Sequence, residues 1–233
     1  MKKHIPNTLT CCNLISGCIA INFALHGMFV WAFLFIVIGA VFDFFDGMSA
    51  RLLGVSSPIG KELDSLADCI TFGFAPATLL FCLLQRVVGQ QYPLLPYIAF
   101  VLAAFSALRL AKFNLDERQA LGFIGLPTPA CALFWASSCA WCNDSAAVSQ
   151  FLAAHSEASA ALLVALMLLS CWMLVSEIPM FALKFKHYAW QGNALKYSFV
   201  LLSALLLVLL GWGGFAPIVV LYVILSVLTC RKK

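Results

Sequence analysis

Five of the ten acidic residues of this 233-residue chain lie between positions 43 and 68. Asp43 and Asp46 are three residues apart, and Asp64 and Asp68 are four apart, so on helices each pair shares one face. Carboxylates brought this close repel one another unless a cation lies between them. Mg²⁺ and Mn²⁺ prefer oxygen ligands, so the spacing predicts a site for two divalent metal ions, Mg²⁺ or Mn²⁺.

Small residues accompany these acids on the same helical faces. Gly47, Ala50 and Gly60 leave the helix surfaces open, and Arg51 adds a cation beside them. Residues 52–59 are too few for more than a short turn, which makes the two helices antiparallel and lets their acidic faces meet. Magnesium usually shares its coordination with substrate phosphates. The pattern therefore predicts a pyrophosphate substrate pressed against the open helix surfaces.

The composition says which elements carry these residues. The chain has 14 basic and 10 acidic residues, or 10% charged, with 63% hydrophobic residues and a mean hydropathy of +0.98. Soluble domains carry about 25% charged residues. This excludes a secreted scaffold, a disordered chain and a nucleic-acid binder, so we expect no nucleic-acid partner. We predict an all-α polytopic membrane helical bundle, surrounded by membrane lipids, that forms a single domain over residues 1–233.

The apolar stretches predict about eight transmembrane helices. They lie at roughly 9–26, 29–53, 61–85, 93–112, 127–143, 158–178, 196–211 and 214–230. If both termini are cytoplasmic, every Lys and Arg except Arg86 falls on the cytoplasmic side, as the positive-inside rule requires. We therefore expect a multi-pass protein of the plasma (inner) membrane with the acidic cluster facing the cytoplasm. Polar residues such as Asn7 and Asn13 interrupt the first stretch, which argues against a cleaved signal peptide.

Acidic residues inside membrane segments have a second interpretation, a proton or cation pathway through an ion-coupled transporter. A transporter predicts internal repeats and acids near the bilayer midplane. The chain shows no obvious repeat, and its acids lie toward one end of their segments. These observations favour an enzyme, and the transporter stays as the alternative of another class.

The acidic region also matches a known pattern. It reads Asp43-x-x-Asp46-Gly47-x-x-Ala50-Arg51, eight residues, then Gly60-x-x-x-Asp64-x-x-x-Asp68. This resembles the signature of the CDP-alcohol phosphatidyltransferases without a departure. Within that family, the stretches at 5–14, 67–76, 108–114 and 123–129 are most similar to the polytopic phosphatidylserine synthases.

The resemblance implies an activity and roles for the matching residues. The phosphatidyl group of CDP-diacylglycerol would pass to the hydroxyl of L-serine, releasing CMP, in a homodimeric enzyme; glycerol 3-phosphate and inositol phosphate are the alternative acceptors. Asp43, Asp46, Asp64 and Asp68 would bind the two metals, and Asp68 would also be the general base. The residues implied to contact the CDP-lipid are Pro6, Asn7, Thr8, Gly47, Ala50, Arg51, Ser57 and Gly60.

The acceptor site rests on the chemistry of serine, whose carboxylate needs a cation. Arg109 lies at the expected cytoplasmic end of the fourth segment, with Lys112 and Asn114 nearby. We predict that Arg109 binds the serine carboxylate and that Asn114 contributes to the same site. The alternative is that Arg109 and Lys112 only reach toward the membrane surface, as basic residues at helix ends commonly do.

Overall fold

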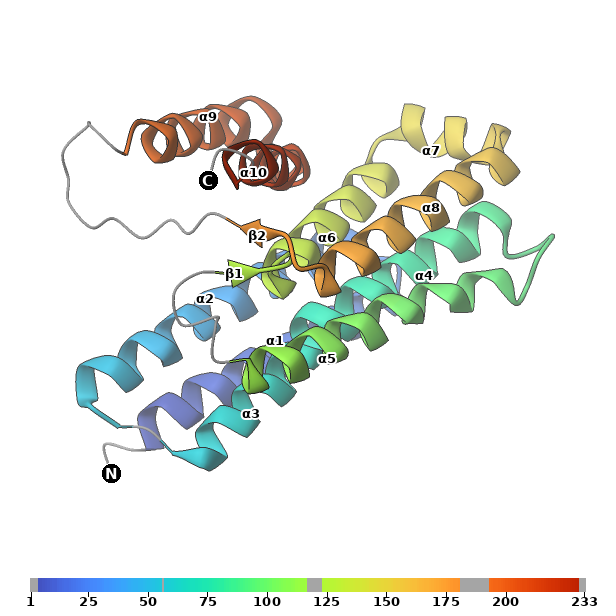
Figure 1. The fold of residues 1–233 in the computed structure, drawn as a ribbon. Helices are drawn as coiled ribbons and strands as arrows, with labels where there is room; N and C mark the ends of the chain where they lie inside the picture. The colour runs from blue at the N-terminus through green and yellow to red at the C-terminus, as the bar shows by residue number, and fades with distance from the viewer. Residues whose placement is uncertain (1–3, 56, 117–122, 181–192, 231–233) are drawn as a thin grey trace.

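The computed structural model describes residues 4–55, 57–116, 123–180 and 193–230. Within these ranges the chain is helical, apart from one short two-stranded sheet (Figure 1). The α-helices are α1 (His4–Leu25), α2 (Phe29–Leu53), α3 (Pro58–Asp68), α4 (Ala75–Val88), α5 (Phe100–Leu115), α6 (Thr128–Asp144), α7 (Ala146–Ala154), α8 (Ser156–Val175), α9 (Ala194–Leu210) and α10 (Phe215–Cys230). The other elements are the π-helix η1 (Cys69–Phe74), the 3-10 helices η2 (Leu95–Ala99) and η4 (Gly211–Gly214), and the strands β1 (Phe123–Ile124) and β2 (Pro179–Met180).

Helices α1 to α6 and α8 run side by side and form a bundle around α4, and the short α7 joins α6 to α8 at one end (Figure 1). Nine of the 14 residues of α4 are buried, including Leu79, Leu80 and Leu84, so this helix lies in the interior of the bundle. The outer helices instead expose large apolar side chains such as Leu168 and Leu201. A buried central helix and an apolar outer surface are typical of a bundle that faces lipid.

Contacts at the two ends of the bundle agree with an alternating direction for the second to fifth predicted segments, the third of which contains α3, η1 and α4. At one end, the Arg86 guanidinium donates to Asn143 Oδ1 and lies 4.7 Å from the ring centroid of Phe29. These contacts join the end of α4 to the end of α6 and the start of α2. At the other end, Lys61 Nζ donates to the carbonyl of Asn114 at 3.0 Å, so the start of α3 meets the end of α5.

Six helical stretches in the described residues are long and apolar enough to cross a membrane. The last of them, residues 195–229, contains α9, the turn η4 and α10. At 17 residues, α6 falls just short of a full span. The structure is thus a multi-pass membrane bundle with a helix at each of the eight predicted positions, while the number of crossings stays a prediction. The basic residues used for orientation that lie outside the described residues are Lys2, Lys3, Arg118, Lys184, Lys186, Arg231, Lys232 and Lys233.

Three local features differ from the sequence-based expectation. The first helix begins at His4, so Pro6, Asn7 and Thr8 are helical residues. The third predicted segment contains the π-helix η1 between α3 and α4. Strands β1 and β2 pair in antiparallel fashion, with Ile124 opposite Pro179, and hold the start of α6 against the end of α8.

Candidate active site

A tight reversal of the chain places the acidic residues of α2 opposite those of α3. Gly54 ends α2 with φ +62°, and its N–H bonds to the carbonyls of Ala50 and Arg51. Ser57 then caps α3 by accepting a 3.0 Å hydrogen bond from the backbone N–H of Gly60, and Pro58 is the first helical residue. A left-handed glycine, a serine cap and an N-terminal proline are common helix stop and start signals.

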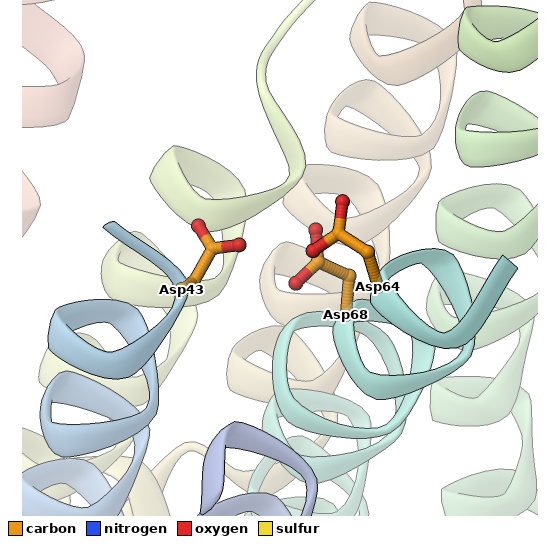
Figure 2. A group of neighbouring side chains, drawn as sticks. All are labelled: Asp43, Asp64 and Asp68. Atoms are coloured by element: carbon orange, nitrogen blue, oxygen red, sulfur yellow. The ribbon is translucent and has the colours of Figure 1, made fainter. Parts of the chain in front are cut away.

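Three of the four predicted metal ligands meet across this reversal. Asp43 projects from α2 toward Asp64 and Asp68 on α3 (Figure 2). Each carboxylate offers an oxygen that lies within 4.8 Å of the other two. Oδ1 of Asp64 is buried and has no hydrogen-bond partner. A buried, unpartnered carboxylate oxygen beside two further carboxylates is a donor set that fits a hard divalent cation.

The fourth acid, Asp46, is held away from this group of three. Its Oδ2 accepts a 2.6 Å hydrogen bond from the hydroxyl of Thr10 on α1, and its side chain is buried. Asp46 lines the neighbouring pocket together with Asp64. The structure therefore brings three predicted ligands together and places the fourth on the pocket wall.

This pocket has a volume of about 480 Å³ and lies between α1, α2 and α3. Six of the eight residues predicted to contact the CDP-lipid line it: Pro6, Asn7, Gly47, Ala50, Ser57 and Gly60. A Cβ atom on Gly60 would lie 3.0 Å from Ser57 Oγ and 3.2 Å from Asn7 Oδ1. A larger side chain at this point would crowd these two side chains. The pocket thus joins the N-terminal helix to the acidic signature.

The remaining two predicted contacts, Thr8 and Arg51, do not line the pocket. The hydroxyl of Thr8 is exposed and donates to the carbonyl of His4 at 2.9 Å. Nε of Arg51 donates to the carbonyl of Gly47 at 2.9 Å, which lays the exposed guanidinium along the pocket rim. Since neither side chain is buried, both are free to turn toward a bound phosphate.

Arg109 lies in a second pocket, of about 390 Å³, at the ends of α5 and α8. Arg109 is only 6% exposed, so its side chain is enclosed by the protein. Nη1 donates to Thr128 Oγ1 at 3.1 Å, and the guanidinium lies 5.1 Å from the ring centroid of Phe113. Nε and Nη2 are buried without a partner. Two unpaired N–H groups on a buried cation leave room for an anionic ligand.

The other two polar residues near Arg109 differ from it. Lys112 lines the same pocket but is exposed, as expected of a residue that reaches toward the surface. Asn114 does not line the pocket: its Nδ2 donates to Ser65 Oγ at 2.7 Å. This bond and the Lys61 contact tie the end of α5 to α3. Asn114 thus connects the Arg109 region to the helix that carries Asp64 and Asp68.

Two polar residues of α1 contact the acidic cluster and were not predicted as site residues. Thr10 bonds to Asp46, and Nδ2 of Asn13 donates to Asp68 Oδ1 at 3.1 Å. Both are buried. A signal for them exists in the sequence, because Pro6, Thr10, Asn13 and Gly17 share one helical face of an otherwise apolar segment.

Comparison with known proteins gives a consistent result. The model of the CDP-alcohol phosphatidyltransferase family matches residues 3–175, which includes everything from α1 to α8. The CDP-diacylglycerol–serine O-phosphatidyltransferase of Bacillus subtilis is 40% identical over 131 residues, covering 54% of this chain and 70% of that protein. The proteins of the same name from Methanocaldococcus jannaschii and Helicobacter pylori are 37% and 34% identical. Their alignments cover 60% and 55% of this chain but only 62% and 54% of those proteins.

Proposed function

The chain belongs to the CDP-alcohol phosphatidyltransferase family, and from this premise we propose that it transfers the phosphatidyl group of CDP-diacylglycerol to the hydroxyl of L-serine. The products are phosphatidylserine and CMP. The observation that carries the proposal is the meeting of three carboxylates from two helices within 4.8 Å, beside a pocket lined by Gly47, Ala50 and Gly60. Membership of a transferase family also favours the enzyme over the transporter.

Asp43, Asp64 and Asp68 would hold the divalent ions, Mg²⁺ or Mn²⁺, with Asp46 completing the set from the pocket wall. When bound, such ions neutralise phosphate oxygens and the charge that develops on a phosphate leaving group. The orphaned oxygen of Asp64 supports this assignment. The protein's own part is to keep the four carboxylates in place before the substrate arrives.

The 480 Å³ pocket is the proposed binding site of the CDP-lipid. Gly47, Ala50 and Gly60 let the pyrophosphate approach the helix backbones, and Arg51 on the rim presents a planar guanidinium that suits phosphate. Pro6, Asn7, Thr8 and Ser57 contact the nucleotide part. Because α2 also exposes Phe44 and Phe45, the acyl chains can stay in the lipid that surrounds the bundle.

Asp68 is the proposed general base, which takes the proton of the acceptor hydroxyl as its oxygen attacks phosphorus and CMP leaves. The acceptor would lie between Asp68 and Arg109, because the contacts of Lys61 and Asn114 hold the end of α5, which carries Arg109, against α3. The unpaired Nε and Nη2 of Arg109 can bind a carboxylate in a two-point contact. The names of the relatives support serine as the molecule that carries this carboxylate.

The resemblance to the CDP-alcohol phosphatidyltransferases supports a homodimer in the plasma (inner) membrane. The positive-inside pattern supports a cytoplasmic active site, where the water-soluble serine and CMP can enter and leave.

A parallel acceptor assay tests the proposal. The purified protein in detergent is given CDP-diacylglycerol with serine, glycerol 3-phosphate or inositol phosphate, and CMP release is measured. We expect release with serine at least tenfold faster than with either phosphorylated acceptor. A preference for one of those two would replace the acceptor but keep the chemistry, whereas no CMP release with any of them would overturn the proposed function. Transport needs a sealed compartment and this reaction does not, so turnover in detergent also excludes the transporter.

A further inference from the structure

Asn13 is a fully buried polar residue inside the first helix of the bundle. Its side-chain Nδ2 donates a 3.1 Å hydrogen bond to Oδ1 of Asp68, 55 residues further along the chain. A carboxylate only accepts hydrogen bonds, so the amide must present its NH₂ group to Asp68. One oxygen of Asp68 is therefore held by α1, and Oδ2 is left for other partners.

Asn13 is itself held in place by Thr71 of the π-helix η1. The hydroxyl of Thr71 donates a 2.9 Å hydrogen bond to the backbone carbonyl of Asn13. Thr71 is completely buried and belongs to the same helical stretch as Asp68. Two hydrogen bonds therefore join one turn of α1 to both sides of the α3–η1 junction.

Glycines on two helices make this close approach possible. A Cβ atom on Gly17 of α1 would lie 2.8 Å from Thr71 Cα, which real side chains do not tolerate. A Cβ atom on Gly39 of α2 would lie 3.0 Å from Asn13 Oδ1 and would also press on Thr71. Because the two glycines let α1, α2 and η1 pack closely around Asn13 and Thr71, Asn13 has little freedom to move away from Asp68.

The π-helix η1 begins immediately after Asp68. Each π turn inserts an extra residue into the helical ladder, and such insertions are rare and frequently found at functional sites. Asp68 just before the π-helix and Thr71 within it both bond to Asn13. These two hydrogen bonds fix the orientation of the α3–η1 junction relative to α1.

We propose that Asn13 is a positioning residue for Asp68, which is the general base and a metal ligand in the proposed function on which this inference rests. By holding Oδ1, the Asn13 amide aims Oδ2 at the metal and the acceptor hydroxyl. Outer hydrogen-bond partners of metal ligands typically change metal affinity or activity by about 10- to 100-fold when they are removed. Asn13 makes no contact with substrate in this role and acts only through Asp68.

The test measures Mn²⁺ binding to the purified protein from the electron paramagnetic resonance signal of free Mn²⁺, together with kcat and KM. Asn13→Leu keeps the size of the side chain and removes the donor. We expect it to weaken Mn²⁺ binding and to lower kcat, each by about tenfold or more, with the KM for CDP-diacylglycerol within about threefold. Ser16→Ala is the matched control, because Ser16 is a buried polar residue of the same helix whose hydroxyl donates to the carbonyl of Cys12, within α1. It should leave both values within about twofold.

A double-mutant cycle separates positioning from a merely structural role. In an Asp68→Asn background, Asn13→Leu should not weaken Mn²⁺ binding further, since its effect passes through the lost carboxylate. An equal loss in both backgrounds, or unchanged Mn²⁺ binding by a folded Asn13→Leu protein, would overturn the inference. If Asn13→Leu does not fold, Thr71→Val removes only the anchor and is read by the same criteria. Mn²⁺ binding requires no acceptor, so the result stands apart from the acceptor assay of the proposed function.

Discussion

Thr10 on α1 donates a 2.6 Å hydrogen bond to Asp46 on α2, so a residue outside the acidic signature holds one of its four carboxylates. The bond keeps Asp46 on the wall of the CDP-lipid pocket, apart from the group formed by Asp43, Asp64 and Asp68. Helix α1 therefore belongs to the site as much as α2 and α3 do. It contributes pocket wall at its first turn and hydrogen bonds to two carboxylates further along.

Thr10→Val tests the role of this bond, because valine keeps the shape of threonine and lacks the donor. Hydrogen bonds to charged groups contribute about 1.5–3 kcal/mol, so we expect kcat/KM for CDP-diacylglycerol to fall by about tenfold or more. Ser137→Ala is the control, since Ser137 is buried and its hydroxyl donates to the carbonyl of Phe134, within α6. If Thr10→Val and Ser137→Ala had the same small effect, Asp46 would not depend on Thr10.

Removal of divalent metal should abolish activity. Excess EDTA leaves the carboxylates of Asp43, Asp64 and Asp68 without a counter-charge, and added Mg²⁺ or Mn²⁺ should restore CMP release. Asp43→Asn and Asp64→Asn should each raise the metal concentration for half-maximal activity by about tenfold or more. Glu62→Gln is the matched control, because Glu62 lies in the same acidic stretch but is exposed and outside the cluster. Full activity in EDTA would remove the metal mechanism.

Asp68→Asn should separate chemistry from binding. Asparagine keeps the shape of the side chain and cannot take a proton from the acceptor hydroxyl, and loss of a general base typically costs about 10²- to 10⁴-fold in rate. We expect kcat to fall by at least 100-fold, while CDP-diacylglycerol still binds at saturating Mg²⁺ with an affinity within about tenfold of the wild type. Turnover near the wild-type rate would show that another group accepts the proton.

Local patterns predicted much of this architecture. Apolar runs predicted a helix at each of eight positions, and the spacing of Asp43, Asp64 and Asp68 correctly predicted that their faces meet. The turn at Gly54 and Ser57 follows from residue chemistry alone. Each of these features is decided within a few residues, where hydropathy, helical periodicity and capping act directly.

The features that were missed depend on contacts between residues far apart in the chain. The position of Asp46 depends on a hydroxyl 36 residues earlier. The π-helix after Asp68 contains Thr71, which packs closely against Gly17 and Gly39 of two other helices. The β1–β2 pair joins short segments that have no strong strand pattern of their own. A local pattern can mark Thr10 as part of a polar helical face, but it does not give the partner of the residue, because these contacts form only when the helices pack.

Gly125→Ala should weaken the contact between the start of α6 and the end of α8, where β1 pairs with β2. Gly125 has φ +74°, and a Cβ atom there would lie 2.8 Å from the carbonyl oxygen of Leu174 and 2.9 Å from that of Ser176. Gly54→Ala is the matched control for stability, because Gly54 also has positive φ but open space where the Cβ would be. Backbone strain alone costs about 1–2 kcal/mol. We expect Gly125→Ala to lower the apparent Tm clearly more than Gly54→Ala does. Equal decreases in Tm would mean that the backbone around Gly125 shifts to make room for the methyl group.

Arg109 and Lys112 provide a matched pair for testing the serine site, since both line the second pocket but only Arg109 is buried. Arg109→Gln removes the charge and keeps a group that can still bond to Thr128. Because charged hydrogen bonds contribute about 1.5–3 kcal/mol, we expect the KM for serine to rise by about tenfold or more. The KM for CDP-diacylglycerol should stay within about threefold.

Lys112→Gln should change the KM for serine by less than about threefold, because an exposed ammonium is well solvated and its interactions are screened. Thermal unfolding of both variants in detergent shows whether either change disturbs the fold. A rise in both substrate KM values for Arg109→Gln would mean that Arg109 supports the whole site and does not bind serine. A larger effect for Lys112→Gln than for Arg109→Gln would move the carboxylate to the rim of the pocket. The expected result, a selective effect of the buried cation alone, would place the acceptor carboxylate at the two unpaired N–H groups of Arg109.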